Sequence, residues 1–272
     1  MDPVLYHGIA TVGLLGLIGL ELRSARFRSS TFGDPGRVRR NWSFLVAALV
    51  AIALVRLASD AVAGILPRLL HWDGAFALEV TACFLVAELL NWLAHWAKHH
   101  DPFLWRFHFQ HHRESRYSIW LVTHTHPLEV VVTGTLMSAA LALLGFSPAA
   151  MQAYLLFYSL ANTYQHASFD YSLGPLDRLI VNPSYHRVHH AIGKQGNYGS
   201  TLTVWDVVFG TAHFPATRVA DPAMRYGLEP GGGEPLGFRE ELTWFLEPEA
   251  SAPPAREPLP ILASTSGRLP RA

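Results

Sequence analysis

The sequence predicts an all-α integral membrane bundle of four to five hydrophobic helices that carries a histidine-rich helical cap. Half of the 272 residues are hydrophobic and only 15% are charged, whereas an ordinary soluble domain carries about 25% charged residues. The apolar residues gather in long runs, and 12 of the 15 histidines lie between His95 and His190. Because the formal net charge is zero, nothing in the composition favours a nucleic-acid partner. Cys83 is the only cysteine, which excludes a disulfide framework and a cysteine-ligated metal cluster.

The first two predicted helices lie near the start of the chain. Residues 4–22 are almost uninterrupted apolar residues, and arginines follow this run instead of preceding it. This charge order is the reverse of a secretory signal, so we expect a retained anchor helix. Residues 42–66 form a second run, long enough to cross a hydrocarbon core of about 30 Å. We therefore assign residues 1–74 to N-terminal membrane helices.

Two further apolar stretches follow. Residues 75–96 form the third run and lead directly into the first histidines. Residues 127–166 form a fourth block, which Pro148 divides into a helical hairpin, since proline suits the first turn of a helix and not its interior. We expect residues 75–215 to form one domain. Residues 216–272 are rich in Pro, Gly and Glu, which predicts a largely disordered C-terminal segment, with a short helix near 240–246.

The orientation of the bundle follows from the basic residues. The loop between the first two runs holds six arginines and one aspartate, so the positive-inside rule places that loop in the cytoplasm. Counting spans from this loop brings every histidine cluster to the cytoplasmic side. We therefore expect an integral membrane protein, in a bacterial inner membrane, with a cytoplasmic cap.

Three short segments carry the histidines in a repeated spacing. Residues 95–99 read HWAKH, residues 108–112 read HFQHH and residues 186–190 read HRVHH. In a helix, positions i, i+3 and i+4 share one face, so each segment can direct two or three imidazoles toward one point. Histidine is the commonest metal ligand. Each segment is therefore a candidate partial ligand set.

His166 adds a further candidate, because Asn162 precedes it by one helical turn and could be a ligand or hold a water molecule. Nine imidazoles exceed the needs of a four-coordinate zinc site. Shared between two six-coordinate ions, they leave about three positions for oxygen species. Imidazole also suits zinc, copper and nickel, and the H-E-x-x-H motif of zinc peptidases is absent.

Together these segments resemble a known family. The HWAKH segment, the phrases LWRFHFQHH and HTHPLE, the HRVHH segment and the closing stretch NYGSTLTVWDVVFGT are similar to the fatty acid hydroxylase superfamily, also called the sterol desaturase family, of membrane di-iron oxygenases. The resemblance covers roughly residues 88–211. It implies two iron ions, with O2 as co-substrate, that hydroxylate or desaturate a C–H bond of a lipid.

The resemblance also implies a ligand set. The metal ligands carried over are His95, His99, His108, His111, His112, His166, His186, His189 and His190. Further candidates, as ligands or as residues that orient ligands, are Asn162, His126, Glu88 and Asp206, with Glu129 and Asp170 as additional orienting carboxylates. Glu88 lies two turns before His95 on the same helix face, which makes it a candidate partner of His95. His100 and His124 are expected to be exposed or outside the ligand set.

Oxygen activation consumes electrons, and the chain has neither a dinucleotide-binding G-x-G-x-x-G after a strand nor a cysteine cluster. The electrons must then come from a separate ferredoxin-like or cytochrome-like donor protein. A docking face for an acidic donor and a solvated cytoplasmic surface both explain the same basic residues, Arg106, Arg113, Arg116, Arg178, Arg187 and Lys194. The alternative functions are a non-catalytic membrane protein that binds or transports divalent metal, and a redox-inert zinc hydrolase. The sequence does not name the lipid.

Overall fold

The computed structural model describes residues 3–63, 65–215, 224–228 and 237–247. All named elements in these residues are helices. Extended pairing within them is limited to two isolated bridges, Ile180 with Leu202 and Ala191 with Tyr226. The all-α prediction is therefore confirmed for the part of the chain that is described.

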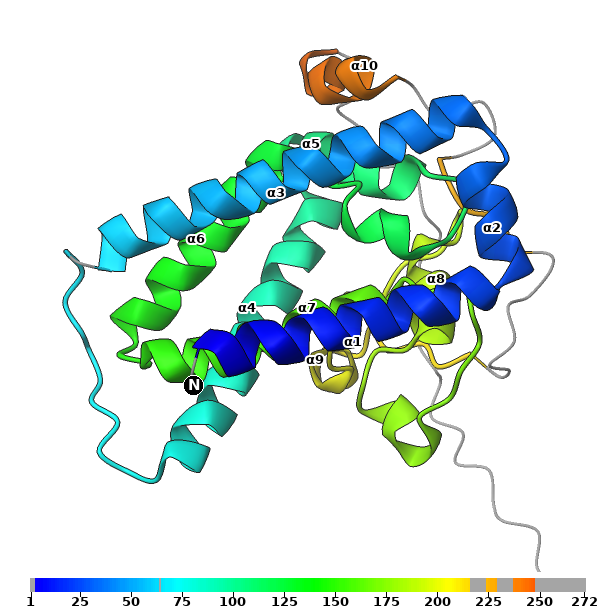
Figure 1. Ribbon diagram of the computed structural model, residues 1–272. Coiled ribbons are helices and arrows are strands. Elements are labelled where there is room, and N and C mark those ends of the chain that lie inside the picture. Colours follow the sequence, from blue (N-terminus) through cyan, green and yellow to red (C-terminus); the bar gives the residue numbers. More distant parts are fainter. Residues whose placement is uncertain (1–2, 64, 216–223, 229–236, 248–272) are drawn as a thin grey trace, which may run out of the picture.

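Five long helices form the body of the molecule (Figure 1). They are α1 (Pro3–Arg23), α3 (Pro35–Ala63), α4 (Phe76–His100), α6 (Pro127–Leu143) and α7 (Pro148–Gln165). Each covers one of the predicted apolar runs. The predicted hairpin is α6 and α7, and Pro148 begins the second helix, where the Ser147 hydroxyl accepts a hydrogen bond from the Ala150 N–H at 3.2 Å.

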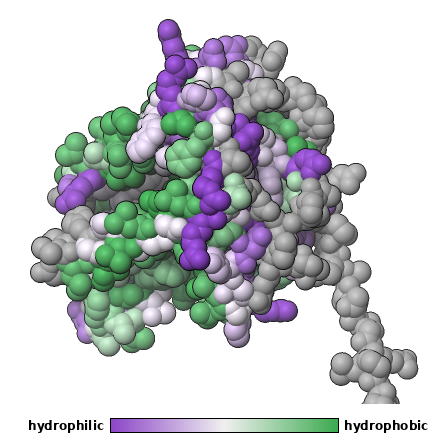
Figure 2. Space-filling model, turned by 45° about the vertical axis from the view of Figure 1, so that its right-hand side comes forward, coloured by the Kyte–Doolittle hydropathy of each residue, from purple (hydrophilic) through white to green (hydrophobic). Residues whose placement is uncertain are grey.

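Two of these helices are long and apolar enough to cross a membrane, Pro35–Val62 and Phe76–His100. Only 6% of the apolar window of the first and 28% of that of the second is buried inside the protein. Large apolar side chains such as Leu57 and Leu78, each 67% exposed, point outward, and Figure 2 shows hydrophobic residues covering much of the left of its view. A core helix of a soluble protein would bury this surface, so a bilayer is its natural environment.

Shorter helices complete the fold. They are α2 (Ala25–Phe32), α5 (Pro102–Arg113), α8 (Pro183–His190), α9 (Val204–Phe209) and α10 (Phe238–Thr243), with the 3-10 turns η1 (Ile119–Val122), η2 (Gly174–Arg178) and η3 (Trp244–Leu246). The two helices that carry histidine triplets begin in the same way. Asp101 caps α5 and Asn182 caps α8, and in both helices proline occupies the first position. These caps fix where each helix starts and hence which way its histidines face.

The packing brings distant parts of the chain together. Helix α3 packs along α6, α4 packs against α5 and α7, and α1 packs against α7. Cys83 belongs to the apolar core between α4 and the hairpin, with Leu141 and Tyr154. Figure 1 shows α2 and α8 toward one end of the bundle and the turn between α6 and α7 toward the other.

The C-terminal region is described in part. Helix α10 and the turn η3 occupy residues 238–246, so the predicted short helix near 240–246 is present. The predicted disorder of the tail falls mainly on residues 248–272, which lie outside the described residues. The proposed domain boundaries at residues 74 and 215 stay predictions, although α3 packs on α6 across the first of them.

Candidate metal centre

Nine buried histidines assemble into two adjoining groups. Within each group the candidate ligand nitrogens lie within 4.8 Å of one another. The five-histidine group consists of His95, His99, His108, His112 and His189, and the four-histidine group of His111, His166, His186 and His190. These nine are the histidines that the sequence resemblance assigned as ligands.

The position of each histidine on its helix decides which of the two groups it joins. Helix α4 supplies two of its three histidines, His95 and His99, to the five-histidine group. On α5, His108 and His112 are four residues apart and join that group, whereas His111 joins the other. On α8, His186 and His190 join the four-histidine group and His189 joins the five-histidine group. Each triplet therefore serves both groups, so α5 and α8 hold the two groups side by side.

The Nδ1 atoms of several of these rings meet backbone carbonyl oxygens. The contacts are His95 with Tyr198 at 2.8 Å, His111 with Leu121 at 3.1 Å, His166 with Asn162 at 2.7 Å and His189 with Gly196 at 2.9 Å. Because a carbonyl oxygen only accepts, each of these Nδ1 atoms must carry the proton. The Nε2 atom of each ring is then left with a lone pair, which is the state a metal requires.

The Nε2 atoms face one another. The Nε2 atom of His166 lies 3.3 Å from that of His111 and 3.0 Å from that of His186. Since His111 and His166 both place their proton on Nδ1, no proton stands between their Nε2 lone pairs, and a shared cation would relieve the repulsion. Two nitrogens at right angles around an ion, with bonds of about 2.1 Å, are about 3.0 Å apart. The observed separations fit this requirement.

The five-histidine group gives the same result. The Nε2 atoms of His189 and His112 are 3.2 Å apart, and the buried Nε2 of His95 has no hydrogen-bond partner. A buried nitrogen without a partner costs stability unless something binds it. The donor set of both groups therefore fits metal ions that imidazole nitrogen can hold.

Burial also keeps these imidazoles neutral. It lowers the pKa of His166 to about 4. Burial, together with neighbouring histidines, lowers the pKa values of His111, His186 and His190 well below the ordinary value. At neutral pH these rings need lose no proton to bind a metal.

Glu129 contacts one of the candidate ligands. Its Oε1 atom lies 3.1 Å from His108 Nδ1 and accepts a hydrogen bond from Lys98 Nζ at 2.6 Å. A carboxylate on the outer nitrogen of a ligating histidine fixes the ring and raises its basicity. The carboxylate is held in the first turn of α6.

Glu88 does not orient His95, contrary to the expectation from their spacing. Its carboxylate accepts hydrogen bonds from the Tyr154 hydroxyl at 2.8 Å and from the backbone N–H groups of Thr201 and Leu202 at 3.0 and 2.9 Å. Although Glu88 and His95 share a helix face, they do not contact each other, because the segment around Thr201 and Leu202 returns to α4 and its backbone N–H groups bind Glu88. Glu88 ties that returning segment to the bundle.

Asp206 organises the loop that holds His95. It accepts hydrogen bonds from the Trp92 indole, the Tyr185 and Thr211 hydroxyls, and the N–H groups of Tyr198 and Gly199, at 2.6 to 3.0 Å. The carbonyl of Tyr198 is the acceptor for His95. Asp206 therefore acts on the candidate ligand His95 through one intervening residue, Tyr198. The sequence does not reveal the role of the Tyr198 carbonyl, since a backbone acceptor leaves no residue signature.

The remaining candidates lie outside the two groups. Asn162 offers its backbone carbonyl to His166, while its side-chain oxygen accepts from Gln165 at 2.6 Å. His126 caps α6 through Nδ1, and its Nε2 donates to the Leu242 carbonyl at 3.1 Å.

The two histidines expected outside the ligand set are also placed. His100 is exposed, and its ring stacks on Trp96 at 4.4 Å between centroids. His124 is buried against Phe44, with 4.8 Å between ring centroids.

The basic docking face is not formed as a whole. Arg113 and Arg187 are only 5% and 2% exposed. The Arg113 guanidinium lies 5.1 Å from the Trp244 ring, and Arg187 pairs with Asp170. Both arginines are buried and make contacts within the protein, whereas Arg116, Arg178 and Lys194 are exposed.

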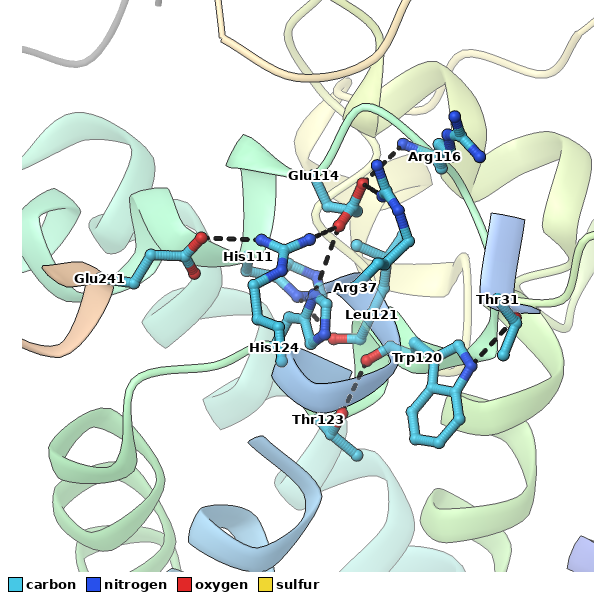
Figure 3. Close-up of polar contacts among 11 residues, drawn as sticks. Thr31, Arg37, His111, Glu114, Arg116, Trp120, Leu121, Thr123, His124 and Glu241 are labelled. Atoms are coloured by element: carbon cyan, nitrogen blue, oxygen red, sulfur yellow. Dashed lines mark hydrogen bonds and ion pairs between the residues drawn. The ribbon is translucent and has the colours of Figure 1, made fainter. Parts of the chain in front are cut away.

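A buried ion-pair network surrounds Glu114, the residue that follows the last residue of α5 (Figure 3). Glu114, two residues after His112, pairs with Arg37 at 2.6 Å and with Arg40, and Arg40 also pairs with Glu241 of α10 at 2.7 Å. Although burial raises the pKa of Glu114, the positive charge of Arg40, with His124 and Arg37, brings it below the usual value. The carboxylate is therefore ionised beside the histidines.

Fold and site together define a helical protein with two candidate membrane spans and two buried groups of imidazoles that could hold metal ions. Residues 80–211, which include all nine histidines, match the sequence model of the family described as fatty acid hydroxylase. The chain therefore carries a domain of the fatty acid hydroxylase superfamily, as its histidine segments indicated.

Three relatives show the range of this similarity. Ornithine lipid hydroxylase from Rhizobium tropici is 32% identical over 153 residues, which is 53% of this chain and 44% of the relative. Alkylglycerol monooxygenase from Homo sapiens is 28% identical over 162 residues, 58% of this chain and 34% of the relative. Methylsterol monooxygenase 1 from Rattus norvegicus is 28% identical over 147 residues, which is 53% of this chain and 49% of the relative. The chain thus spans less than half of each relative. No solved structure matches it.

Proposed function

We propose that this protein is a membrane oxygenase that uses O2 and two external electrons to hydroxylate a C–H bond of a lipid, with one iron ion in each histidine group. One observation carries the proposal: the Nε2 atoms of His111 and His166 face each other at 3.3 Å while both rings place their proton on Nδ1. Such a buried arrangement requires a cation.

The donor set favours iron over a structural zinc ion. Nine nitrogens serve two six-coordinate ions and leave about three of twelve positions for oxygen species. Bound there, two iron ions would supply the activation of O2 for attack on a C–H bond. A zinc site built only for structure closes with four ligands.

The protein's own residues prepare this chemistry by holding the ligands. Carbonyl acceptors keep the protons of His95, His111, His166 and His189 on Nδ1. Glu129 supplies negative charge behind His108. Burial of all nine rings excludes bulk water, which strengthens the local electrostatics and protects reactive species from solvent.

The proposed substrate is a lipid held in the bilayer. The three relatives described above are named as a hydroxylase of an ornithine lipid and as monooxygenases of alkylglycerol and methylsterol. These names favour hydroxylation over desaturation and an amphipathic substrate. The apolar outer face of α3 and α4 supports a location of the protein in the same medium.

The proposed topology has four to five spans, with α1, α6 and α7 joining α3 and α4, and a cytoplasmic histidine cap in a bacterial inner membrane. The cap lies beside the arginine-rich segment between α1 and α3, which the positive-inside rule puts in the cytoplasm. A cytoplasmic ferredoxin-like or cytochrome-like protein would supply the electrons. The metal-transport alternative is weaker, because transport sites lie near mid-membrane, whereas His95 and His99 stand in the last turns of α4.

The test is turnover of lipid by the purified protein in nanodiscs made from a bacterial lipid extract, with a ferredoxin, its reductase and ¹⁸O2. We expect a lipid product heavier by one ¹⁸O atom, seen by mass spectrometry, that disappears in the His186→Ala variant. Metal-loaded protein that gives no labelled lipid with either a ferredoxin or a cytochrome donor would contradict the proposal and favour the metal-binding alternative.

A further inference from the structure

Glu21 is a fully buried carboxylate near the end of α1, with 0% exposure. It lies outside residues 80–211, which match the family. Its Oε2 atom accepts a hydrogen bond from the Ser168 hydroxyl at 2.6 Å, and its Oε1 atom accepts another from the Ser168 N–H. One carboxylate therefore holds a single residue by both its backbone and its side chain.

Ser168 follows His166 by two residues. His166 is the only one of the nine histidines that does not belong to an i, i+4 pair or triplet, and it stands just past the last residue of α7. The chain from this point to η2 has no regular secondary structure. The Asn162 carbonyl of α7 accepts from His166 Nδ1 at 2.7 Å, whereas the backbone that follows His166 is not held by helix geometry.

Three buried side chains hold this segment instead. The Tyr117 hydroxyl donates to the Gln165 carbonyl at 2.6 Å. Arg187 donates to the carbonyls of Ala167 at 2.9 Å and Phe169 at 3.2 Å. Glu21 holds the residue between these two carbonyls. Each side chain satisfies a different backbone group, so Tyr117 and Arg187 do not replace what Glu21 provides.

Arg187 links this segment to the four-histidine group. Arg187 is 2% exposed and follows His186, a member of the four-histidine group. Its direct partner is Asp170, which remains 24% exposed. Loss of Glu21 would remove the acceptor of both Ser168 hydrogen bonds inside a buried segment.

We propose that Glu21 is a positioning residue for the four-histidine group, so that the N-terminal helix, which lies outside the matched family domain, completes one half of the metal centre. Glu21 acts through Ser168 on His166 and touches no metal itself. The inference rests on the proposed function in one respect, that the four-histidine group holds a metal ion.

Glu79 offers a matched control at the other end of α7. It is also a buried carboxylate on a neighbouring helix, and its Oε1 atom accepts a hydrogen bond from the N–H of Ser147, the cap of α7, at 2.6 Å. Glu79→Ala removes the same kind of contact from the same helix, but at the end opposite to His166. A general loss of packing around α7 would therefore affect both variants alike.

The experiment measures iron per chain in detergent-purified full-length protein, before and after a chelator challenge, for wild type, Glu21→Ala, Glu79→Ala and His186→Ala. Circular dichroism and the thermal midpoint are recorded for each. Loss of a residue that orients a ligand weakens metal affinity by about 10- to 100-fold. We expect two irons in wild type and Glu79→Ala, and about one in Glu21→Ala and His186→Ala after the challenge, with helical content unchanged.

The outcomes separate the two claims. If Glu21→Ala keeps two irons that resist the chelator as in wild type, or if Glu79→Ala loses iron equally, the inference is wrong and the proposed function stands. If wild type binds no iron, the proposed function itself fails. If Glu21→Ala does not fold, Ser168→Ala decides, because it removes only the hydroxyl contact. Retention of wild-type chelator resistance in Ser168→Ala would then overturn the inference, and faster loss of one iron would support it.

Discussion

The Nε2 atom of His186 lies 3.0 Å from the Nε2 atom of His166, although the two residues are 20 positions apart and come from different elements. One stands on α8 and the other just past the end of α7. Both rings are buried. The fold thus brings two neutral nitrogens to the separation that a shared ion requires, and the following predictions test what this arrangement does.

Removing one histidine from each group should remove each metal separately. His111→Ala affects the four-histidine group, His112→Ala affects the five-histidine group, and the double variant should lose both iron and activity. Metal analysis and lipid turnover measure the effect. His100→Ala is the control, since His100 is exposed and lies in neither group. Full activity in the double variant would contradict the ligand assignment.

Asp206→Asn should destabilise the loop behind His95. Asp206 accepts hydrogen bonds from five donors. In Asp206→Asn an NH2 group replaces one of the accepting oxygens, so it faces N–H and O–H groups that it cannot accept from. The cost of leaving buried donors unsatisfied is about 1–3 kcal/mol each, so we expect a thermal midpoint lower by several degrees and weaker iron retention. Asp34→Asn is the control, because Asp34 contacts only an exposed turn at Gly36. Equal midpoints for both variants would refute this role.

Arg40→Met should weaken the attachment of α10. Arg40 is shared between Glu114 and Glu241, and the loss of one partner from a buried ion pair costs about 3–5 kcal/mol. Adding Glu241→Gln should recover part of this loss, because it removes the carboxylate that has lost its ion-pair partner, whereas Glu114 keeps Arg37. A double-mutant cycle on the free energy of unfolding measures the coupling. Strict additivity of the two substitutions would show that the pair is not coupled.

His124 should contribute to acid sensitivity. Burial lowers its pKa to about 3, from an ordinary value near 6.5. Below about pH 6.5 the unfolded chain therefore binds a proton at His124, whereas the folded protein does not. The contribution of His124 to the free energy of unfolding is thus complete above that pH and falls as the pH drops toward 3. At pH 5 the loss amounts to about 2 kcal/mol.

The His124→Gln variant tests this contribution. Between pH 7 and pH 5 its stability should fall by about 2 kcal/mol less than that of wild type, as measured by denaturant unfolding in detergent. His100→Gln serves as the comparison, because it makes the same substitution at an exposed position outside both histidine groups. The same pH slope in His124→Gln and wild type would contradict the prediction.

The five long helices could be predicted from the sequence because apolar runs and proline positions report them directly. Helix α2 was missed, since its eight residues ARFRSSTF are short and polar. Its signal is Ser24, whose hydroxyl accepts a hydrogen bond from the Phe27 N–H at 3.3 Å. A single cap residue is weak evidence without the neighbouring helices.

The nine histidines could also be selected from the sequence, by spacing and resemblance. Their division into groups of five and four could not, because it depends on how α5 and α8 are rotated against each other. The carbonyl of Tyr198 as acceptor for His95 leaves no trace in residue identity. Glu88 was paired with His95 by helix spacing, whereas its partners come from residues more than 60 positions away.

The most direct test of the central claim is the metal content and Mössbauer spectrum of the protein purified in mild detergent from cells grown with ⁵⁷Fe. We predict two irons per chain in a coupled pair, since the two histidine groups adjoin on α5 and α8. A single zinc ion per chain, or natively folded protein without metal, would contradict the account.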